Sequence, residues 1–427
     1  MSLFKKTKEI AIDLGTANTI ISVDGKIVVE EPSVVLKYDD KYIATGRRGL
    51  CSHVHDPDVC EYIWPLEGGI VNDYVGLRFM LHEYLSRIDL RHNFLFSHSI
   101  RMRICAPRHV RDAVNEIIGD FKKWDYIPVE DCHILQYETD AVALALGVDP
   151  GINPVPLLLV DIGGTVTNIA YYSNEAYHIK CSPCIAIGGC QFTRDILDYL
   201  YEKHNIIIGR AAERVKREVG SAVSFLDNPP EDYVVQGRDA TTFAQKEISV
   251  SYREIAPCLE KSINAIEAAV RQTLEQMPKA EYNYIAKRGI HLTGGGALLR
   301  GLADCLLERI GIKFVLAEDP LYTMIKGLEV GIKNSYRRYY SDSDVKALRE
   351  KCEENYLQYL MELHEDVSQM MSDGSMTEGD VKCYLTHVSN IVRDHKTKTP
   401  DYAEKFIQEL KEYSEKQGYD LEKIFGK

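Results

Sequence analysis

Two stretches of the sequence combine an apolar run, an aspartate, glycine and hydroxyl residues in the same order. Residues 12–19 read Ile-Asp-Leu-Gly-Thr-Ala-Asn-Thr, and residues 160–167 read Val-Asp-Ile-Gly-Gly-Thr-Val-Thr. A third run, residues 292–299, reads Leu-Thr-Gly-Gly-Gly-Ala-Leu-Leu. Glycine lets backbone N–H groups approach phosphate oxygens and supplies positive φ in turns. In this order the runs indicate two facing lobes whose hairpin turns bind the phosphates of one nucleotide, with a third loop under the base.

The residue types within these runs suit a phosphate that carries a metal ion. Asp13 and Asp161 end the two apolar runs, where a carboxylate alone would repel phosphate. Mg²⁺ keeps several waters and is held through one or two carboxylates plus phosphate oxygens, so we expect both aspartates to hold Mg²⁺ through water. The alternative is that each aspartate only caps its turn. The residues expected to contact the nucleotide at the three turns are Gly15, Thr16, Ala17, Asn18, Gly163, Gly164, Thr165, Gly294, Gly295, Gly296 and Ala297.

Composition narrows the class of protein. The chain has 427 residues, 45% of them hydrophobic, and this length predicts roughly two to four domains. A net charge of −13 argues against nucleic acid as the main partner. No hydrophobic run approaches the length of a membrane span, and residues 1–10 lack the apolar core of a signal peptide. The 11 cysteines follow no regular framework, which indicates reduced thiols in a cytoplasm.

Two clusters raise the alternative of a bound metal. Cys181 and Cys184 have ligand spacing but no second pair, and they lie in a strand-like run, so core or turn cysteines are favoured over zinc. A second cluster could supply four ligands, although its spacing matches no common site. It consists of Cys51, His53, His55 and Cys60.

The expected elements repeat along the chain. The first half shows, in order, strands at 9–13, 19–23 and 27–29, a helix at 75–90, a strand at 100–106, and helices at 108–123 and 139–147. The second half starts again with a strand at 157–161. Strand, hairpin, crossover helix, strand and helix thus appear twice. This repetition predicts an α/β fold duplicated into two lobes.

The motifs resemble those of the MreB/Mbl family of bacterial actin-like, rod-shape-determining proteins. The resemblance covers roughly residues 8–333 in family order and spacing. Among the segments that carry it are Asp-Leu-Gly-Thr-Ala-Asn-Thr at 13–19, Glu-Pro-Ser-Val-Val at 31–35 and Gly-Ile-Val-Asn-Asp-Tyr at 69–74. The remaining segments are 212–222, 292–300 and Ala-Glu-Asp-Pro-Leu at 317–321.

The resemblance implies an actin-like ATPase fold, in which two duplicated lobes form four subdomains around a nucleotide cleft. It places the first lobe at residues 1–150, with a small insert at about 33–74. The second lobe then occupies residues 151–338, with an insert at about 190–250. ATP and Mg²⁺ are the implied cofactors.

Residues 339–427 lie beyond the resemblance and should form an α-helical extension. Apolar residues at helical spacing predict three helices, at about 342–371, 378–395 and 400–417. We expect a last core helix at 321–335 to complete the second lobe. The extension would then lie outside a closed core and be dispensable for nucleotide binding. The alternative is that the apolar stripe between Val345 and Met370 packs back across the lobes as part of the fold.

Departures from the family pattern lie near the expected chemistry. Where the family has a third glycine, a hydroxyl residue and an acidic residue, this chain has Thr165, Val166 and Asn168. Glu138 matches the family glutamate that faces the γ-phosphate, and it is the candidate for orienting the attacking water. The alternative is a helix N-terminal carboxylate favoured by the helix dipole. We therefore expect ATP binding with slow hydrolysis.

Glu213 and Lys216 lie three residues apart and so share one helix face. The family uses this face for the ribose hydroxyls and adenine. An isolated Glu-x-x-Lys pair is usually a surface ion pair, but the surrounding motif favours a role in ribose binding.

The resemblance also implies function. MreB-like proteins form double, membrane-attached filaments that organise cell shape and cell-wall synthesis, by head-to-tail contacts that do not close into a ring. We expect a cytoplasmic protein at the inner membrane face, with itself and cell-wall synthesis and shape proteins as partners. The same fold serves other functions, so a non-hydrolysing or non-polymerising scaffold is the alternative.

One segment is expected to contact the membrane. An apolar triplet stands between a predicted helix and a predicted strand, where a loop is normally polar, and arginines flank it. In the family this loop enters the bilayer, and Leu3 and Phe4 near the N-terminus could add an anchor. Alternatively, the triplet packs on a neighbouring subdomain. Its residues are Phe94, Leu95 and Phe96.

Overall fold

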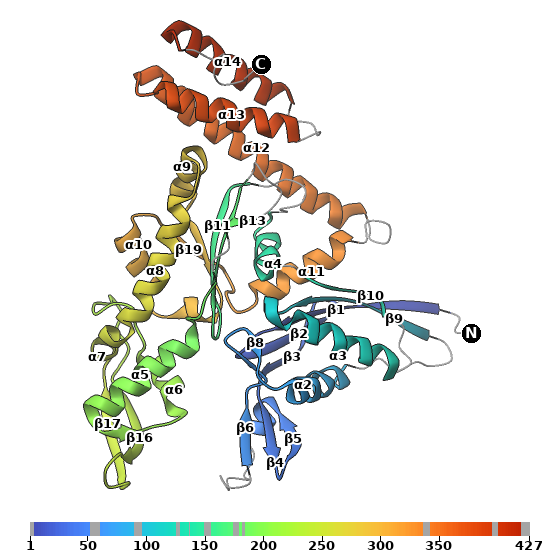
Figure 1. Ribbon diagram of the computed structural model, residues 1–427, viewed down its shortest axis with the longest axis vertical. Coiled ribbons are helices and arrows are strands. Elements are labelled where there is room, and N and C mark those ends of the chain that lie inside the picture. The colour runs from blue at the N-terminus through green and yellow to red at the C-terminus, as the bar shows by residue number, and fades with distance from the viewer. Residues whose placement is uncertain are drawn as a thin grey trace.

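The structure is a computed structural model of the chain. It describes residues 4–51, 60–88, 96–124, 129–135, 137–148, 155–173, 179–181, 184–335, 342–394 and 400–419. Figure 1 shows two lobes side by side, with the C-terminal helices stacked beyond one end of the second lobe. Within these ranges, no helix has both the length and the apolar character needed to cross a bilayer.

The first lobe is built on a five-stranded sheet with β1 at its centre. β1, β2 and β3 are joined by hairpins, and β9 and β10 lie parallel to β1 on its other side. Asp24 and Gly25 have φ of 51° and 77°, which is the turn chemistry that an Asp-Gly pair predicts between two strands. The strands are β1 (Phe4–Leu14), β2 (Asn18–Val23), β3 (Lys26–Pro32), β9 (Phe96–Cys105) and β10 (Val129–Ile134).

The two faces of this sheet have different cores, as the two-residue period of a strand requires. Ile10 and Ile12 are fully buried in a core that also contains the apolar faces of α2 (Tyr74–Ser86) and α3 (Arg111–Trp124). Ala11, between them, belongs to a separate core on the opposite face. That second core is shared with the other lobe.

The second lobe repeats the strand plan of the first. β11 takes the central place of β1, β12 pairs with it through a hairpin, and β18 and β19 lie parallel on its other side. The prediction of an α/β fold duplicated into two lobes is confirmed. The strands are β11 (Leu157–Ile162), β12 (Thr167–Tyr172), β13 (Ile179–Cys181), β14 (Cys184–Ile185), β18 (Ile290–Thr293) and β19 (Phe314–Leu316).

Helices α4 (Glu138–Ala145) and α11 (Thr323–Ser335) cross closely between the lobes. Gly327 lies so near the carbonyl oxygen of Ala141 that any Cβ there would overlap it. The helix at 321–335 was expected to complete the second lobe, and α11 also packs on β1 and β9 of the first sheet. Its buried Met324 and Leu328 share a core with Ala11.

Each lobe carries a small insert. In the first lobe it is a three-stranded sheet of β4 (Val35–Tyr38), β5 (Lys41–Thr45) and β6 (Cys60–Ile63), followed by a β7–β8 pair at 66–71. In the second lobe it comprises α5 (Gly189–His204), α6 (Ala211–Val219), β15 (Ile206–Ile207), β16 (Tyr233–Asp239) and β17 (Gln245–Val250).

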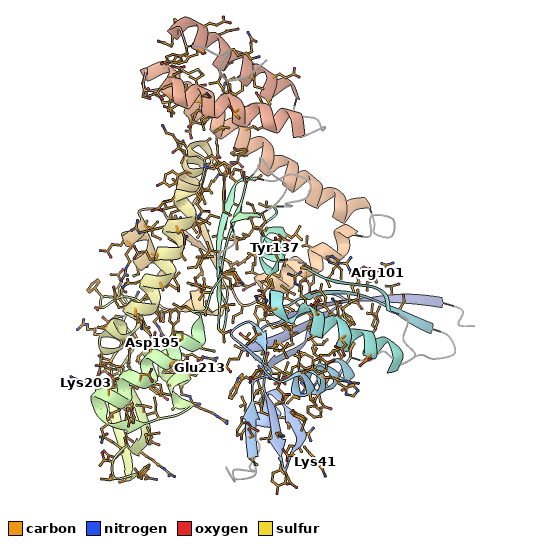
Figure 2. The ribbon with its side chains drawn as sticks, in the orientation of Figure 1. Lys41, Arg101, Tyr137, Asp195, Lys203 and Glu213 are labelled. Carbon is orange, nitrogen blue, oxygen red and sulfur yellow. The ribbon has the colours of Figure 1, made fainter. Side chains whose placement is uncertain are left out.

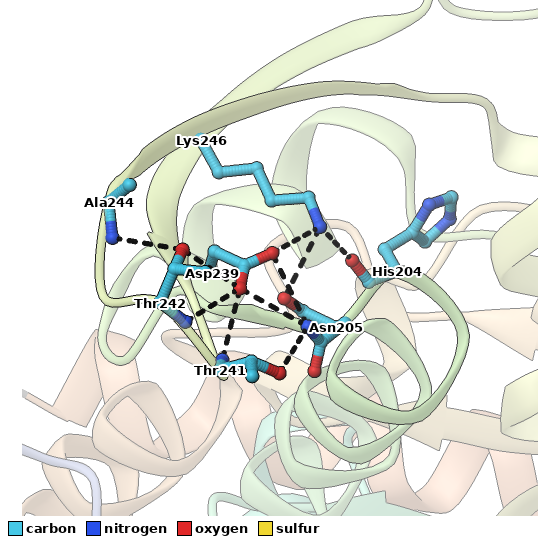
Figure 3. A network of polar contacts seen from close by, with 7 residues as sticks. All are labelled: His204, Asn205, Asp239, Thr241, Thr242, Ala244 and Lys246. Carbon is cyan, nitrogen blue, oxygen red and sulfur yellow. Dashed lines mark hydrogen bonds and ion pairs between the residues drawn. The ribbon is translucent and has the colours of Figure 1, made fainter.

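A network of polar contacts holds together one end of the second insert (Figure 3). The Asp239 carboxylate accepts hydrogen bonds from Lys246 Nζ at 2.9 Å and from the backbone N–H groups of Thr241 and Thr242 at 3.0 Å. These donors hold the pKa of Asp239 well below its usual range. The network holds the β16–β17 turn against the end of α5. The side of the insert that faces the cleft between the lobes is formed by α5 and α6.

The remaining helices of the second lobe include α9, on which the C-terminal extension packs. They are α7 (Tyr252–Ile255), α8 (Glu260–Glu275), α9 (Lys279–Arg288) and α10 (Leu302–Ile310), and a short helix α1 (Gly46–Leu50) follows β5 in the first lobe.

The three predicted C-terminal helices are confirmed as α12 (Asp342–Asp373), α13 (Glu378–Asp394) and α14 (Pro400–Gln417). α12 and α13 pack on α9, at the end of the second lobe far from β16 and β17, and α14 packs on α13 (Figure 1). The rings of Tyr284 and Tyr359 meet edge to face, with centroids 4.6 Å apart. Tyr359, Leu363 and Val367 share the hydrophobic core of the second lobe. The described part of the apolar stripe, from Tyr359 to Met370, therefore packs on the second lobe.

Candidate functional site

A cavity of about 730 Å³ lies between the lobes, and most of the residues predicted to form the nucleotide and metal site line it. Glu213 approaches it from α6, and Tyr137, which precedes Glu138, lies at the start of α4 (Figure 2). Thr165 and Ala297 do not line the cavity. The predicted residues that do are Asp13, Gly15, Thr16, Ala17, Asn18, Glu138, Asp161, Gly163, Gly164, Glu213, Lys216, Gly294, Gly295 and Gly296.

The two predicted phosphate loops are equivalent hairpin turns. In the first, the N–H of Gly15 donates to the carbonyl of Asn18 at 3.1 Å, and in the second, the N–H of Gly163 donates to the carbonyl of Val166 at 2.9 Å. Each turn follows the central strand of its sheet. The repeated sequence thus corresponds to a repeated backbone geometry.

These turns touch each other across the cleft. A Cβ on Gly164 would come within 2.5 Å of the Cβ of Ala17 and 3.1 Å of Thr16 Oγ1. Position 164 therefore requires glycine, because any side chain would separate the turns. Next to this contact, the Thr165 hydroxyl donates to Thr16 Oγ1 at 2.8 Å.

Three carboxylates converge on the cavity. Asp13 and Asp161 each stand next to the last residue of their central strands, and Glu138 begins α4. Burial, with the added repulsion of Glu138 and Asp161, raises the pKa of Asp13 well above its ordinary value. Burial raises the pKa of Asp161 to about 6, and burial together with Asp161 raises that of Glu138 to about 7. Grouped carboxylates with raised pKa values mark a place where a cation would be bound favourably.

Asn168 holds two of these carboxylates. It lies opposite Asp161 in the β11–β12 register, and its amide donates to Glu138 Oε2 at 3.2 Å. It also hydrogen-bonds Asp161, which lowers the pKa of that carboxyl against the effect of burial. The sequence marked Asn168 only as a departure from the family pattern. Its register opposite Asp161 in a predicted hairpin was the signal for a role in the site.

The predicted Glu213–Lys216 pair forms a network at the wall of the cavity. Lys216 Nζ donates to Glu213 Oε2 at 2.7 Å and to the carbonyl of Gly189 at 2.8 Å. Thr193 Oγ1 donates to the same Glu213 oxygen at 2.7 Å. Burial disfavours the Glu213 carboxylate, but Lys216 and the hydrogen bonds hold its pKa below the ordinary value. Glu213 is therefore an ionised acceptor of fixed orientation, which suits ribose hydroxyl groups.

The third glycine loop, residues 294–296, lies against the end of β11, where Asp161 stands. Gly294 has φ of 83°, and a Cβ there would meet Asp161 Oδ1 at 2.5 Å, so both its conformation and its surroundings require glycine. Sequence reasoning missed several other cavity residues. Some of them neighbour predicted motifs and could have been inferred from these, namely Arg217 beside Glu213 and Lys216, and Leu298, Leu299 and Arg300 in the third glycine run. Arg47, Phe192 and Met324 stand apart in sequence from the predicted motifs.

Comparison with known proteins agrees with this geometry. The model of the family described as MreB/Mbl protein matches residues 7–338. The chain belongs to the MreB/Mbl family. Cell shape-determining protein Mbl of Bacillus subtilis (strain 168) is 32% identical over 332 residues, which cover 77% of this chain and 96% of that protein. Cell shape-determining protein MreB of Escherichia coli (strain K12) is 32% identical over 335 residues, covering 75% and 92%.

Solved structures show the same fold. MreB 5 of Spiroplasma citri bound to AMPPNP superposes with a TM-score of 0.68 at 26% identity, covering 78% of this chain and 98% of that one. A MamK double helical filament superposes with a TM-score of 0.59 at 18% identity, which supports the fold. The recognition of an MreB/Mbl protein is confirmed, and the chain is an actin-like cytoskeletal protein.

The segment that was expected to contact the membrane is only partly described. Phe94 and Leu95 lie outside the described residues, and Phe96 is described by its backbone at the start of β9. His53 and His55 of the proposed metal cluster, and Ser182 and Pro183 between the paired cysteines, also lie outside. Among the residues that the structure does describe, no group of three or more His, Cys, Asp or Glu side chains could hold a metal ion.

Proposed function

We propose that this MreB/Mbl protein binds ATP with Mg²⁺ in the cavity between its lobes. The observation that carries the proposal is the pair of equivalent turns, each following a strand that brings an aspartate to the cavity. Backbone N–H groups at two facing turns suit a chain of phosphates that spans the cleft. The relative from Spiroplasma citri binds AMPPNP and ADP.

The carboxylates fit a magnesium ion held through water. No three of the described acidic side chains are arranged to ligate one ion directly, but Mg²⁺ needs only one or two carboxylates when waters and phosphate oxygens complete its shell. Asp13 and Asp161 would hold that hydrated ion, which would neutralise phosphate charge. Burial raises the pKa of both carboxyls, and the charges of Glu138 and Asp161 add to this effect at Asp13, so a nearby cation would favour the ionised carboxylates.

We further propose slow ATP hydrolysis with Glu138 orienting the attacking water. Its Oε2 accepts from Asn168, which leaves Oε1 as the oxygen for water. Val166 also lines the cavity, and it places a methyl group where relatives are expected to have a hydroxyl. Loss of a donor in the transition state costs on the order of 1–3 kcal/mol. This departure is also what favours the second candidate, a non-hydrolysing or non-polymerising scaffold on the same fold.

Attachment to the inner face of the cytoplasmic membrane is supported by the sheet register. β1 and β9 pair in parallel, and Phe4 is the partner of Phe96. The first residues of β1 and of β9 therefore lie side by side at one end of the first sheet, at the right of Figure 1. Two weak anchors side by side act as one stronger anchor, and a polymer multiplies them.

The proposed biological role is that of a cytoplasmic, membrane-associated filament that organises cell shape and cell-wall synthesis. Its partners would be further copies of the chain, in a double head-to-tail filament, and proteins of shape and wall synthesis. The supporting observation is family membership with relatives named as cell shape-determining proteins.

Titration calorimetry of ATP with Mg²⁺ tests the binding step. Asp161→Ala should abolish magnesium-dependent binding, because the ion loses a carboxylate that anchors it. Asp227→Ala is the matched control, since Asp227 is exposed in the same lobe and outside the cavity. Unchanged ATP affinity in Asp161→Ala would remove the assignment of this cavity to Mg²⁺ and ATP.

A further inference from the structure

One hydrogen bond joins the two phosphate turns through side chains alone. Thr165 Oγ1 donates to Thr16 Oγ1 at 2.8 Å, between residues 149 apart in sequence. Thr165 occupies the place of the family's third glycine and does not itself line the cavity. Thr165 therefore supplies a hydroxyl that glycine lacks, and this hydroxyl donates a hydrogen bond to the opposite lobe.

The accepting residue is the one that faces the ligand space. Thr16 lines the cavity and is only 6% exposed. A hydroxyl has one hydrogen to donate and two lone pairs to accept. Because its oxygen accepts from Thr165, the Thr16 hydrogen must point elsewhere. Among the described residues no acceptor is found for that hydrogen, and a nearly buried donor without an acceptor is unfavourable.

We propose that Thr165 is a positioning residue that directs the Thr16 hydroxyl hydrogen toward a phosphate oxygen of the bound nucleotide. This inference rests on the proposed nucleotide site and adds a residue that acts through another residue. The geometry that supports it is the direct contact of the turns, where Gly164 leaves no room between them. A phosphate oxygen is a charged acceptor, and hydrogen bonds to charged groups are stronger than those between neutral groups.

The two successive hydrogen bonds, from Thr165 to Thr16 and from Thr16 to phosphate, should reinforce each other. Accepting a hydrogen bond polarises a hydroxyl and strengthens the bond that it donates. Thr165 should therefore increase affinity for ligands with phosphates and leave binding of the nucleoside part unchanged. A residue that only held the lobes together would affect both to the same degree.

Displacement of a fluorescent ATP analogue from the full chain in Mg²⁺ tests the inference, with ATP and adenosine as competitors. Thr165→Val should weaken ATP binding about three- to tenfold, as expected for loss of one modest hydrogen bond, and leave adenosine binding unchanged. Thr165→Ser should retain wild-type affinity. In the background of Thr16→Val, Thr165→Val should cause no further loss. Thr386→Val removes a hydroxyl whose hydrogen bond stays within α13, and it is the control.

The outcomes separate the proposals. If the wild type does not bind ATP, the proposed function fails and this inference fails with it. If the wild type binds ATP but Thr165→Val binds equally well, only the inference is overturned. Parallel loss of ATP and adenosine affinity, or full additivity with Thr16→Val, also overturns it. Thr165→Gly, which restores the family residue, provides a second variant should Thr165→Val fold poorly, and it should show the same selective loss of ATP affinity.

Discussion

The side-chain amide of Asn168 donates a 3.2 Å hydrogen bond to Oε2 of Glu138 and so joins β12 of the second lobe to the start of α4. An acidic residue at position 168 would place a further carboxylate beside three that already repel one another. The amide instead donates to Glu138 and to Asp161. The site thus contains three carboxylates and the neutral amide of Asn168. This amide orients Glu138, the proposed catalytic residue.

The raised pKa of Glu138 predicts a stability that depends on pH in the absence of nucleotide and Mg²⁺. Its pKa in the folded chain is about 7, above the ordinary 4.5, so folding favours the protonated form. That contribution is fully present below about pH 4.5 and is lost as pH rises through 7. For Glu138 it amounts to at most about 3 kcal/mol.

Calorimetric melting between pH 5 and pH 8 measures this effect. Over that range the wild type should lose stability relative to Glu138→Gln, because the amide cannot ionise. Mg²⁺ with ATP should reduce the difference by neutralising the cluster. Melting temperatures of the two proteins that change in parallel with pH would show that Glu138 does not titrate in this range.

Turnover should respond to Glu138 and Val166 in opposite directions. Glu138→Ala should slow phosphate release while ATP stays bound and filaments are stabilised, because the attacking water loses its acceptor. Val166→Thr should raise the rate by restoring the hydroxyl of the family pattern. A single-turnover assay measures both. Wild-type hydrolysis as fast as that of relatives, with no effect of Val166→Thr, would refute the proposed consequence of this departure.

Sequence patterns predicted the parts of the fold and site that depend on local chemistry. Asp24-Gly25 identified a hairpin, and the repeated Asp-x-Gly runs identified two equivalent turns, because few residues tolerate those backbone conformations. The packing of α11 on the first sheet was not predicted. An amphipathic helix shows that one face is buried but does not show which of two apolar surfaces it covers.

The same limit applies within the site. Asn168 differs from the family residue, and its sequence position alone gave no partner for its amide. Only the antiparallel register and the crossing of α4 place it between Glu138 and Asp161. The Thr16–Thr165 hydrogen bond likewise depends on how closely the lobes approach, which no local pattern encodes.

Membrane binding should depend on the apolar loop and on its neighbour in the sheet. Replacing Phe94, Leu95 and Phe96 by serine removes roughly 5–7 kcal/mol of burial capacity. Liposome co-sedimentation should fall strongly while polymerisation in solution persists, and Phe4→Ser should weaken binding further. Phe225→Ser is the control, because Phe225 is 74% exposed elsewhere on the chain. Undiminished sedimentation of the triple variant would point to another attachment site.

The C-terminal helices should stabilise the second lobe without contributing to nucleotide binding. Tyr359 is fully buried against Tyr284, so Tyr359→Ala should cost about 3–5 kcal/mol and expose the extension to limited proteolysis. Met361→Ala is the matched control, since Met361 lies on the same helix and is 44% exposed.

A truncation after Arg338 extends this test. It should still bind ATP, because the described cavity lining ends at Met324, but it uncovers the apolar face of α9 and should melt at a lower temperature. ATP affinity that falls with the truncation while the protein stays folded would assign the extension a role in the cleft.

Electron microscopy of the purified full chain on lipid bilayers tests whether ATP and Mg²⁺ in this cleft drive assembly on a membrane. With ATP and Mg²⁺ the wild type should form paired filaments on the lipid, and Asp161→Ala should form none. Filaments of equal abundance in Asp161→Ala, or a wild type that binds ATP and stays unassembled on lipid, would contradict the account.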